Sequence, residues 1–553
     1  MVEWRRTNAP GLDARSRAAG CRPSAPPPAL AAGTRAAALA SVLLIAACSG
    51  SESPPAPQAP TQSALEVGQP EGWNQDLALK EVQDLNPDPN VLEFNLEAKI
   101  TELEILKGHK TPVWTYNGSL PGPLIRAKIG DKIIVHFKNS LPEATTIHWH
   151  GMRLPNNMDG APGVTQEPVA SGGSFTYEFT ARDAGTYWYH PHVDSSAQVG
   201  RGLYGPILVE DPNDPKVFGD DLVLVLSDMS LDENGQLLPQ DTGGAFSDLF
   251  GREGSVLLVN GKVVPHLKVR AGKQQRWRVI NAARARYYTL QLPNHTFVKL
   301  GGDNGLAERS ETVNRVLVTP GERADFVFTP SDAPGTASIM KWIPTDRGFG
   351  SLYNRPRQDM LEIDTVDAAP VRPEAIPEHL RDIEPIDVAD AVERTIELTI
   401  EKEPTDANRQ VVMGINHIPS WKAKPIETHL GETDIWRVVN NTAFAHPFHL
   451  HGYFFQVLDE ARIPEWKDTV NVPANSELRL AVTFDERPGM WMYHCHILDH
   501  ADSGMMGELH VAGPGEPPIL HSGGHMHDAG GSHDAGTHAA PNDSAAETAT
   551  VTQ

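Results

Sequence analysis

A strand-like pattern occurs three times in this 553-residue chain, each time between a glycine and an asparagine nine residues later. Apolar residues alternate with polar ones within each copy, which is typical of a β-strand with one buried face. The glycines lie 142 and 159 residues apart, so the repeating unit is a whole domain and not a solenoid repeat of about 20–50 residues. The copies are 130–139 (GDKIIVHFKN), 272–281 (GKQQRWRVIN) and 431–440 (GETDIWRVVN).

Turn residues support an all-β fold. Asn117-Gly118 and Asn260-Gly261 precede the first two copies and are typical of tight turns. The 47 glycines and 46 prolines favour turn-rich β structure over long helices, and the length fits three or four domains. The sequence therefore predicts three homologous β-sandwiches in a linear array.

Histidines separated by one residue form four pairs within residues 1–513. Both histidines of such a pair face the same way when the segment is a strand. These residues contain 18 histidines, for which random placement gives roughly 0.6 pairs. Accident is therefore a poor explanation. The pairs are His148/His150, His190/His192, His449/His451 and His494/His496.

The pairs repeat in context between the first and last thirds of the chain. Residues 185–192 (GTYWYHPH) align with 489–496 (GMWMYHCH), and 148–151 (HWHG) with 449–452 (HLHG). Proline stands at position 191 where the last third has Cys495, so only the last third can build a thiolate site. We expect the two copies to share one histidine cluster.

Cys495 is bracketed by two histidines and followed by His500 and Met505. On a strand it points away from its neighbours, so one strand can serve two metal centres. A thiolate, an imidazole and a thioether are ligands of a blue-copper site, and His446 is the candidate for the second imidazole. The chain has three cysteines, which excludes a structural disulfide within the folded part.

The motifs HWHG, HPH, HPFHLHG and HCHILDHADSGMM resemble the four copper signatures of the multicopper oxidases, over residues from about 86 to 513. The resemblance implies three tandem cupredoxin-like Greek-key β-sandwich domains. It also implies four copper ions: one type 1 in the third domain, and one type 2 and two type 3 in a cluster between the first and third. The implied reaction couples one-electron oxidation of a reducing substrate to four-electron reduction of dioxygen to water.

Each implied ligand follows from its motif position. The resemblance places type-1 copper on His446, Cys495, His500 and Met505. It places type 2 on His148 and His449, one type 3 on His150, His190 and His496, and the other on His192, His451 and His494.

Reduction of dioxygen consumes protons, so carboxylates near the cluster are candidate catalytic residues. Asp159 matches a family acid eleven residues after the first ligand histidine, although an aspartate before Gly160 also fits a plain turn. Bacterial relatives tend to have an acid directly after the type-1 histidine, where this chain has Ala501. Asp499, Asp502 or water are the remaining candidates for proton delivery.

Three functions are compatible with this ligand set. Cuprous oxidases of the family often carry a methionine-rich insert in the third domain, and residues 361–400 and 453–488 contain no methionine. This favours a laccase-like enzyme acting on phenols, aromatic amines or small reducing metal ions. The alternatives are a cuprous oxidase in periplasmic copper tolerance and a non-catalytic copper-sequestering protein, although storage would not require Cys495 between two histidines.

The ends of the chain suggest export. Residues 1–48 combine arginines with a short apolar run and end in Leu-Ile-Ala-Ala-Cys48, which resembles a bacterial lipobox; an ordinary signal peptide is the alternative. We expect a periplasmic lipoprotein tethered to the membrane through lipidated Cys48. The net charge of −24 argues against nucleic acid as a partner, and we expect a monomer.

The sequence predicts seven segments along the chain, of which the last is a histidine-rich tail. The tail is rich in histidine, and it either chelates copper or is a disordered polar terminus. The segments are an export signal (1–48), a flexible tether (49–85), cupredoxin domains (86–212, 213–370 and 396–513), a linker (371–395) and the tail (514–553), whose candidate ligands are His521, His525, Met526, His527, His533 and His538.

Overall fold

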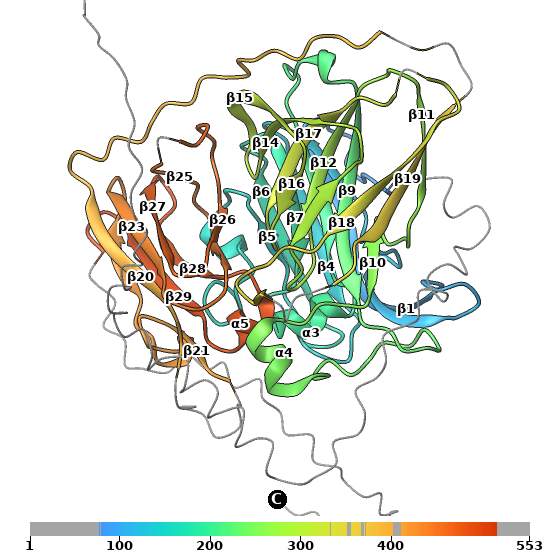
Figure 1. Cartoon of the computed structure of the whole chain (residues 1–553). Helices are drawn as coiled ribbons and strands as arrows, with labels where there is room; N and C mark the ends of the chain where they lie inside the picture. Colours follow the sequence, from blue (N-terminus) through green and yellow to red (C-terminus); the bar gives the residue numbers. More distant parts are fainter. Residues whose placement is uncertain are drawn as a thin grey trace, which may run out of the picture. The chain divides into compact units, whose positions relative to one another are not determined.

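The computed structural model describes residues 77, 79–331, 333–350, 355–366, 370, 372–401, 411–459 and 461–516. Six β-sheets contain most of the regular secondary structure, and successive pairs of sheets follow one another along the chain (Figure 1). The predicted all-β class with three sandwich domains is confirmed. The export signal, most of the tether, and the tail from residue 517 lie outside the described residues, with Cys21, Cys48 and all the tail ligands.

The first domain packs a sheet of order β2-β1-β4-β6 against one of order β3-β8-β7-β5. Its core is aromatic: the ring centroids of Trp149 and Tyr177 lie 5.1 Å apart. The strands are β1 (Val91–Leu103), β2 (Thr111–Tyr116), β3 (Ile125–Lys128), β4 (Lys132–Asn139), β5 (His148–His150), β6 (Ser174–Thr180), β7 (Gly185–His190) and β8 (Gly205–Glu210).

The second domain has sheets of order β10-β9-β12-β17-β14-β15 and β11-β19-β18-β13-β16. Trp277 and Trp342 are fully buried in its core. The strands are β9 (Asp220–Met229), β10 (Val256–Val259), β11 (His266–Arg270), β12 (Gln275–Asn281), β13 (Tyr288–Gln291), β14 (Phe297–Gly302), β15 (Gly305–Val313), β16 (Val316–Val318), β17 (Arg323–Phe328), β18 (Ala337–Ile343) and β19 (Gln358–Val366).

The third domain repeats the plan with sheets of order β21-β20-β23-β27-β25 and β22-β29-β28-β24-β26. Trp436 and Trp491 are buried in its core. The strands are β20 (Val392–Ile400), β21 (Met413–Ile415), β22 (Ile426–His429), β23 (Thr433–Asn440), β24 (His446–Leu450), β25 (Phe455–Val457), β26 (Thr469–Val472), β27 (Ser476–Thr483), β28 (Gly489–Cys495) and β29 (Met506–Ala512).

The repeated asparagine ends an equivalent strand in each domain and is fully buried each time. Asn139, Asn281 and Asn440 each donate from Nδ2 to backbone carbonyls on two segments and accept an N–H two residues ahead. The side chain therefore satisfies buried backbone groups where the chain leaves the strand. The preceding glycines have φ between 69° and 92°, which favours glycine.

The tight turn upstream of the repeat is also present in all three domains. Asn117, Asn260 and Asn416 have positive φ, and each side chain accepts a backbone N–H from a neighbouring strand. The third turn was not predicted because His417 stands where the other two have glycine, and it too adopts a positive φ of 64°.

Short helices lie at one end of the sandwiches (Figure 1). The helix α3 (Ser195–Gly200) follows β7, α4 (Gly244–Phe250) precedes β10, and α5 (Leu498–Asp502) follows β28. Both α3 and α4 contact α5. The first domain contributes α3, the second contributes α4 and the third contributes α5. Single-turn 3-10 helices cover Asn156–Met158, Lys216–Phe218 and Ser420–Lys422. In the part of the chain that the structure describes, no helix has the length and hydropathy of a membrane span.

Two predicted connecting segments are partly structured. Leu77, within the predicted tether, is buried in the core of the second domain, and its carbonyl accepts a bond from Asn260 Nδ2. The predicted linker 371–395 overlaps β20, which begins at Val392 because Val392 pairs with Asp434. The linker also pairs with β15, since the Leu380 N–H donates to the Glu308 carbonyl. Both segments contain apolar residues that the sandwiches bury.

Replacing a repeated asparagine should destabilise its domain. Asn281→Ala leaves two buried carbonyls and one buried N–H without their partner, which costs on the order of 2 kcal/mol or more. The midpoint of denaturant unfolding of the copper-free protein measures this loss. The control is Asn441→Ala, because Asn441 is exposed and its side chain bonds to the half-buried Glu397 carboxylate rather than to a buried backbone group. Equal losses in both variants would contradict the assigned role.

Candidate metal centre

His446, Cys495 and His500 meet in one fully buried group. The Nδ1 atoms of His446 and His500 lie 3.2 Å apart, and Cys495 Sγ lies 3.4 and 3.6 Å from them. His446 begins β24, Cys495 ends β28 and His500 lies on α5. Met505 is fully buried beside them, and its carbonyl accepts the Cys495 N–H. The structure thus brings together three of the four predicted type-1 ligands. The fourth, Met505, is held beside Cys495 by this backbone hydrogen bond.

The far edges of both imidazoles are held by acceptors. His500 Nε2 donates to the Leu249 carbonyl on α4, at 3.1 Å. His446 Nε2 lies 2.8 Å from Thr442 Oγ1, which also bonds to the Asn440 side chain and the Phe444 carbonyl. With a proton on Nε2 of each ring, the tautomer that fits the Leu249 carbonyl and the Thr442 oxygen as acceptors, both Nδ1 lone pairs face the thiol.

Burial keeps this group neutral without metal. It raises the pKa of the Cys495 thiol to about 12. Burial, and then the charge of Arg347, lowers the pKa of His500 to about 3. Two lone pairs and a thiol in contact form a ready site for a soft cation that displaces the thiol proton.

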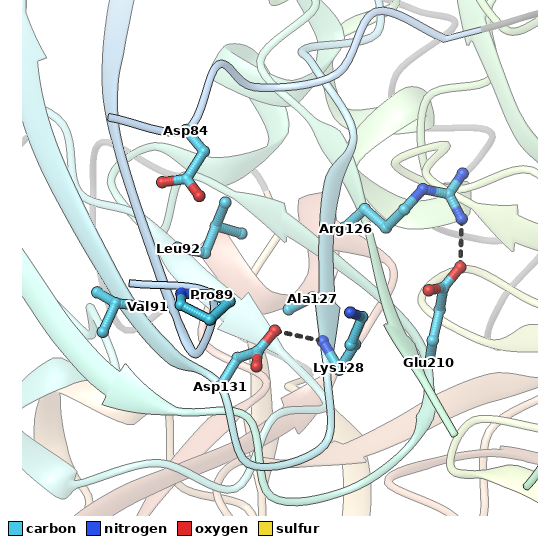
Figure 2. Close-up of a pocket in the computed structure, with 9 residues that line it drawn as sticks. All are labelled: Asp84, Pro89, Val91, Leu92, Arg126, Ala127, Lys128, Asp131 and Glu210. Atoms are coloured by element: carbon cyan, nitrogen blue, oxygen red, sulfur yellow. Dashed lines mark hydrogen bonds and ion pairs between the residues drawn. The ribbon is translucent and has the colours of Figure 1, made fainter. Parts of the chain in front are cut away.

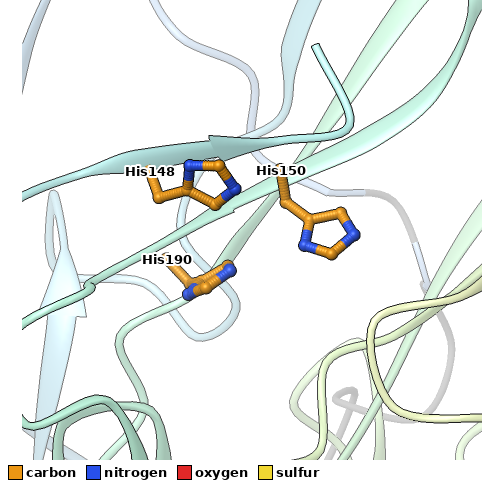
Figure 3. Close-up of side chains that lie close together, drawn as sticks. All are labelled: His148, His150 and His190. Atoms are coloured by element: carbon orange, nitrogen blue, oxygen red, sulfur yellow. The ribbon is translucent and has the colours of Figure 1, made fainter. Parts of the chain in front are cut away.

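Eight further histidines converge between the first and third domains, as predicted. Within the first domain, His148 lies opposite His190 where β5 pairs with β7, and Figure 3 shows these two rings with that of His150. In the third domain, His449 lies opposite His494 where β24 pairs with β28. In both domains the first histidine of one pair lies opposite the first histidine of the other pair. The repeat in the sequence is therefore also a repeat in the strand pairing.

Rings from the two domains stack on one another. The centroids of His148 and His451 lie 3.8 Å apart, as do those of His150 and His449. His192 faces His494 at 5.3 Å, and His496 faces His150 at 4.9 Å. All eight are buried. The interface between the domains is therefore lined with imidazoles.

Many of the inward-facing nitrogens have no hydrogen-bond partner. They are Nε2 of His148, His190 and His449, Nδ1 of His150, and both ring nitrogens of His496. An unpaired buried nitrogen costs free energy, so this set fits metal ions that accept several imidazoles. The site is a donor set of neutral nitrogens, which suits copper.

The groupings agree in part with the predicted ligand sets. His192, His451 and His494 offer ligand atoms within 4.8 Å of one another, which is the predicted set for one type-3 copper. His150, His190 and His496 do not form such a trio, although their ring centroids lie within 5.8 Å. His148 instead groups with His150 and His190, and also with His449 and His451.

Asp159 forms hydrogen bonds with histidines of both the first and the third domain. Its carbonyl accepts from His148 Nδ1 at 2.9 Å, and its carboxylate accepts from His451 Nδ1 at 2.9 Å. Burial raises the pKa of this carboxyl, but the His451 and His148 rings outweigh burial and hold the pKa well below its usual range. Gly160 follows because a Cβ there would meet the Ile147 carbonyl oxygen at 1.9 Å.

Asp468 is a buried carboxylate of the cluster that the sequence did not reveal. Its carboxylate lies 3.1 Å from His150 Nε2, and its carbonyl accepts from His449 Nδ1 at 2.9 Å. Arg323 of the second domain pairs with it, and the guanidinium overcomes burial to hold the pKa of Asp468 well below its usual range. Asp468 follows its ligand histidine by nineteen residues, against eleven for Asp159, so spacing gave no indication of it.

The other two candidate acids lie at the helices. Asp499 pairs with Arg252 and accepts the Ser196 hydroxyl proton at 2.6 Å. Asp502 accepts the Ser196 N–H at 2.8 Å. Both carboxylates therefore join α3 and α5, and a role in proton delivery stays a prediction. Ala501 packs in an apolar cluster with Ala161, Met492 and Met506.

A pocket on the first domain has different chemistry (Figure 2). It lies between the start of β1 and β3, where Arg126 pairs with Glu210 and the Lys128 N–H donates to the Asp131 carboxylate. Its lining contains no histidine, cysteine or methionine. The metal-binding chemistry of the described residues is therefore gathered at the buried histidine clusters.

Three β-sandwiches with one buried Cys-His-His group and one interdomain histidine cluster define a copper protein of the oxidase class. Models of the multicopper oxidase family match residues 97–214, 220–341 and 391–514. A multicopper oxidase of Mycobacterium tuberculosis is 30% identical over 432 residues, which cover 71% of this chain and 82% of that protein. A laccase of Bacillus subtilis is 28% identical, over 73% of this chain and 91% of that protein.

Solved structures show the same relationship. A Campylobacter jejuni multicopper oxidase, described as a metallo-oxidase, superposes with a TM-score of 0.73 at 30% identity and covers 83% of this chain and 98% of that one. The chain belongs to the multicopper oxidase family. It is a copper-dependent oxidoreductase that uses dioxygen as the electron acceptor.

Proposed function

We propose that the chain binds four copper ions and acts as a laccase-like oxidase of phenols and similar reducing substrates. His446, Cys495, His500 and Met505 would hold one type-1 ion. The eight interdomain histidines would hold one type-2 and two type-3 ions, in the sets given by the family motifs. Bound copper supplies one-electron redox chemistry, which couples substrate oxidation to the four-electron reduction of dioxygen. The unpartnered imidazole nitrogens support this ligand assignment.

The chain links the two groups of ligands directly. Cys495 is covalently bonded through the backbone to His494 and His496, and the side chains of all three are fully buried. Electrons entering at the thiolate therefore have a short route through bonds that excludes water. Asp159 is proposed to relay protons as an ionised carboxylate, because this carboxylate lies between histidines of both domains.

The choice of substrate rests on helix α4, which covers His500. The Leu249 carbonyl bonds the outer nitrogen of His500, so an electron donor approaching from this side meets α4 first. Phe246 on α4 is 63% exposed, and its ring lies 4.5 Å from that of Phe250. The Phe250 ring lies 5.9 Å from that of Phe444, which lies 5.7 Å from His500. Aromatic rings thus extend from solvent to the ligand, a surface that suits phenols.

A cuprous oxidase in copper tolerance is the second candidate. The Campylobacter jejuni relative is described as a metallo-oxidase, which favours this function. The residues of α4 are Gly-Ala-Phe-Ser-Asp-Leu-Phe, which include one carboxylate and no soft ligand for Cu(I). The helix therefore favours the phenol oxidase. The Mycobacterium tuberculosis and Bacillus subtilis relatives are named as an oxidase and a laccase, which favours an enzyme over a copper-sequestering protein.

We also propose that the protein is exported to the periplasm as a monomer anchored through lipidated Cys48. Support comes from the arginine-rich leader, the apolar run and the lipobox-like sequence. The His-rich tail is a candidate for copper capture. Globomycin sensitivity of processing in a bacterial host tests the lipidation, and unaltered processing would contradict it.

Cys495→Ser should abolish the intense visible absorption of the purified protein. That band arises from the copper–thiolate bond, and serine offers no thiolate. The wild type should bind four coppers by metal analysis and consume oxygen. A blue Cys495→Ser variant, or a wild type with a single copper and no oxygen uptake, would contradict the proposal.

Asp159→Asn should slow oxygen reduction while leaving reduction of the blue band by substrate nearly unchanged. The amide keeps the size of the side chain but cannot take up a proton and pass it on, and a positioned proton-transfer group contributes about 10²–10⁴-fold to rate. Stopped-flow reduction and steady-state oxygen uptake separate the two steps. If both slow in parallel, Asp159 does not act in proton supply.

Phe246→Ala should lower kcat/KM for phenols by about 2- to 10-fold, the loss expected for one aromatic contact. Oxygen uptake with Cu(I) should change little. Leu85→Ala is the control, because Leu85 is also exposed and lies in the first domain's leading segment. A wild type that oxidises Cu(I) but no phenol would favour the second candidate.

A further inference from the structure

Two aspartates support the histidine cluster in a crossed arrangement. Asp159 of the first domain bonds His148 of its own domain through its carbonyl and His451 of the third domain through its carboxylate. Asp468 of the third domain contacts His449 of its own domain through its carbonyl and His150 of the first domain through its carboxylate. The two aspartates are therefore structural counterparts.

Only one of them is held by an arginine. Arg323, at the start of β17, donates from Nη1 to Asp468 Oδ1 at 2.8 Å and from Nη2 to Oδ2. The same guanidinium donates from Nε to the Thr186 carbonyl of the first domain and from Nη2 to the Asp303 carbonyl of the second. The Arg323 side chain is fully buried. One side chain thus connects all three domains beside the cluster.

The backbone at two glycines packs closely against the Arg323–Asp468 pair and the cluster. A Cβ at Gly151, the residue after His150, would lie 2.5 Å from Arg323 Nη2 and 2.7 Å from Asp468 Oδ2. A Cβ at Gly321 would lie 2.7 Å from His496 Cδ2. The segment that carries Arg323 therefore also forms the wall against which the His496 ring packs.

We propose that Arg323 is a positioning residue of the copper cluster and acts through Asp468. By fixing both carboxylate oxygens, it sets the direction in which Asp468 meets His150 Nε2, and so which edge of that imidazole faces the cluster. The second domain, which supplies none of the predicted copper ligands, thereby contributes to copper binding at the cluster. This inference rests on the proposed ligand roles of the eight histidines.

Two variants test the proposal. Asp468→Asn is nearly isosteric and leaves Arg323 an ionic partner in Asp303, 3.6 Å away, so the fold should be retained. Arg323→Lys keeps the charge but cannot pair bidentately. Both should weaken copper binding at the cluster by about 10- to 100-fold, as loss of outer contacts to metal ligands does. The blue band from Cys495 should stay at wild-type intensity.

The readouts are copper content at buffered free copper and the electron paramagnetic resonance signal of type-2 copper. The matched control is Arg276→Lys, because Arg276 is buried in the same domain and pairs bidentately with Asp325, and within the described part of the chain its guanidinium bonds to aspartates and to none of the cluster histidines. It should lower the unfolding temperature without altering the type-2 signal. The double variant Asp468→Asn/Arg323→Lys should bind copper no more weakly than Asp468→Asn alone.

The outcomes are distinct. Wild-type type-2 signal and copper content in both single variants would overturn the proposal, as would additive losses in the double variant. A signal change in Arg276→Lys equal to that in Arg323→Lys would show a general structural effect and also overturn it. A wild-type protein with no type-2 signal would instead refute the proposed four-copper function.

Discussion

Contact between imidazoles of the first and third domains is the interaction on which the rest of the molecule depends. His148 stacks on His451 and His150 on His449, each at 3.8 Å between centroids. Buried nitrogens without partners cost about 1–3 kcal/mol each, so the metal-free interface is unfavourable until cations bind the imidazoles. The sandwiches supply the rigidity that holds these rings together, and bound metal offsets the cost.

Much of this arrangement was predictable because it depends on strand period and repetition. The Gly–Asn repeat predicted three domains, and Asn139, Asn281 and Asn440 play the same part in each. The HxH pairs predicted rings on one face of a strand, and the pairing of His449 with His494 matches that of His148 with His190. Motifs with the same spacing in the first and third domains therefore form the same strand pairing.

Contacts set by distant loops were not predictable. Asp468 escaped detection because strand β25 lies between His449 and Asp468, whereas no strand separates His148 from Asp159, although both aspartates face the same cluster. Leu249 meets His500 across 251 residues of sequence, and Arg323 meets Asp468 across 145. No local pattern encodes such pairs. The second domain, which has no copper motif, therefore contacts both groups of ligands: Leu249 bonds to His500, and Arg323 bonds to Asp468.

Copper ions are proposed to occupy two places in this molecule, one at Cys495 and one among the eight histidines. Anomalous diffraction from crystals of the copper-loaded protein, measured on both sides of the copper absorption edge, tests this proposal directly. We expect one peak bounded by Cys495 Sγ and the Nδ1 atoms of His446 and His500, and three peaks between the first and third domains. Density at the thiolate alone, with none among the eight histidines, would contradict the account.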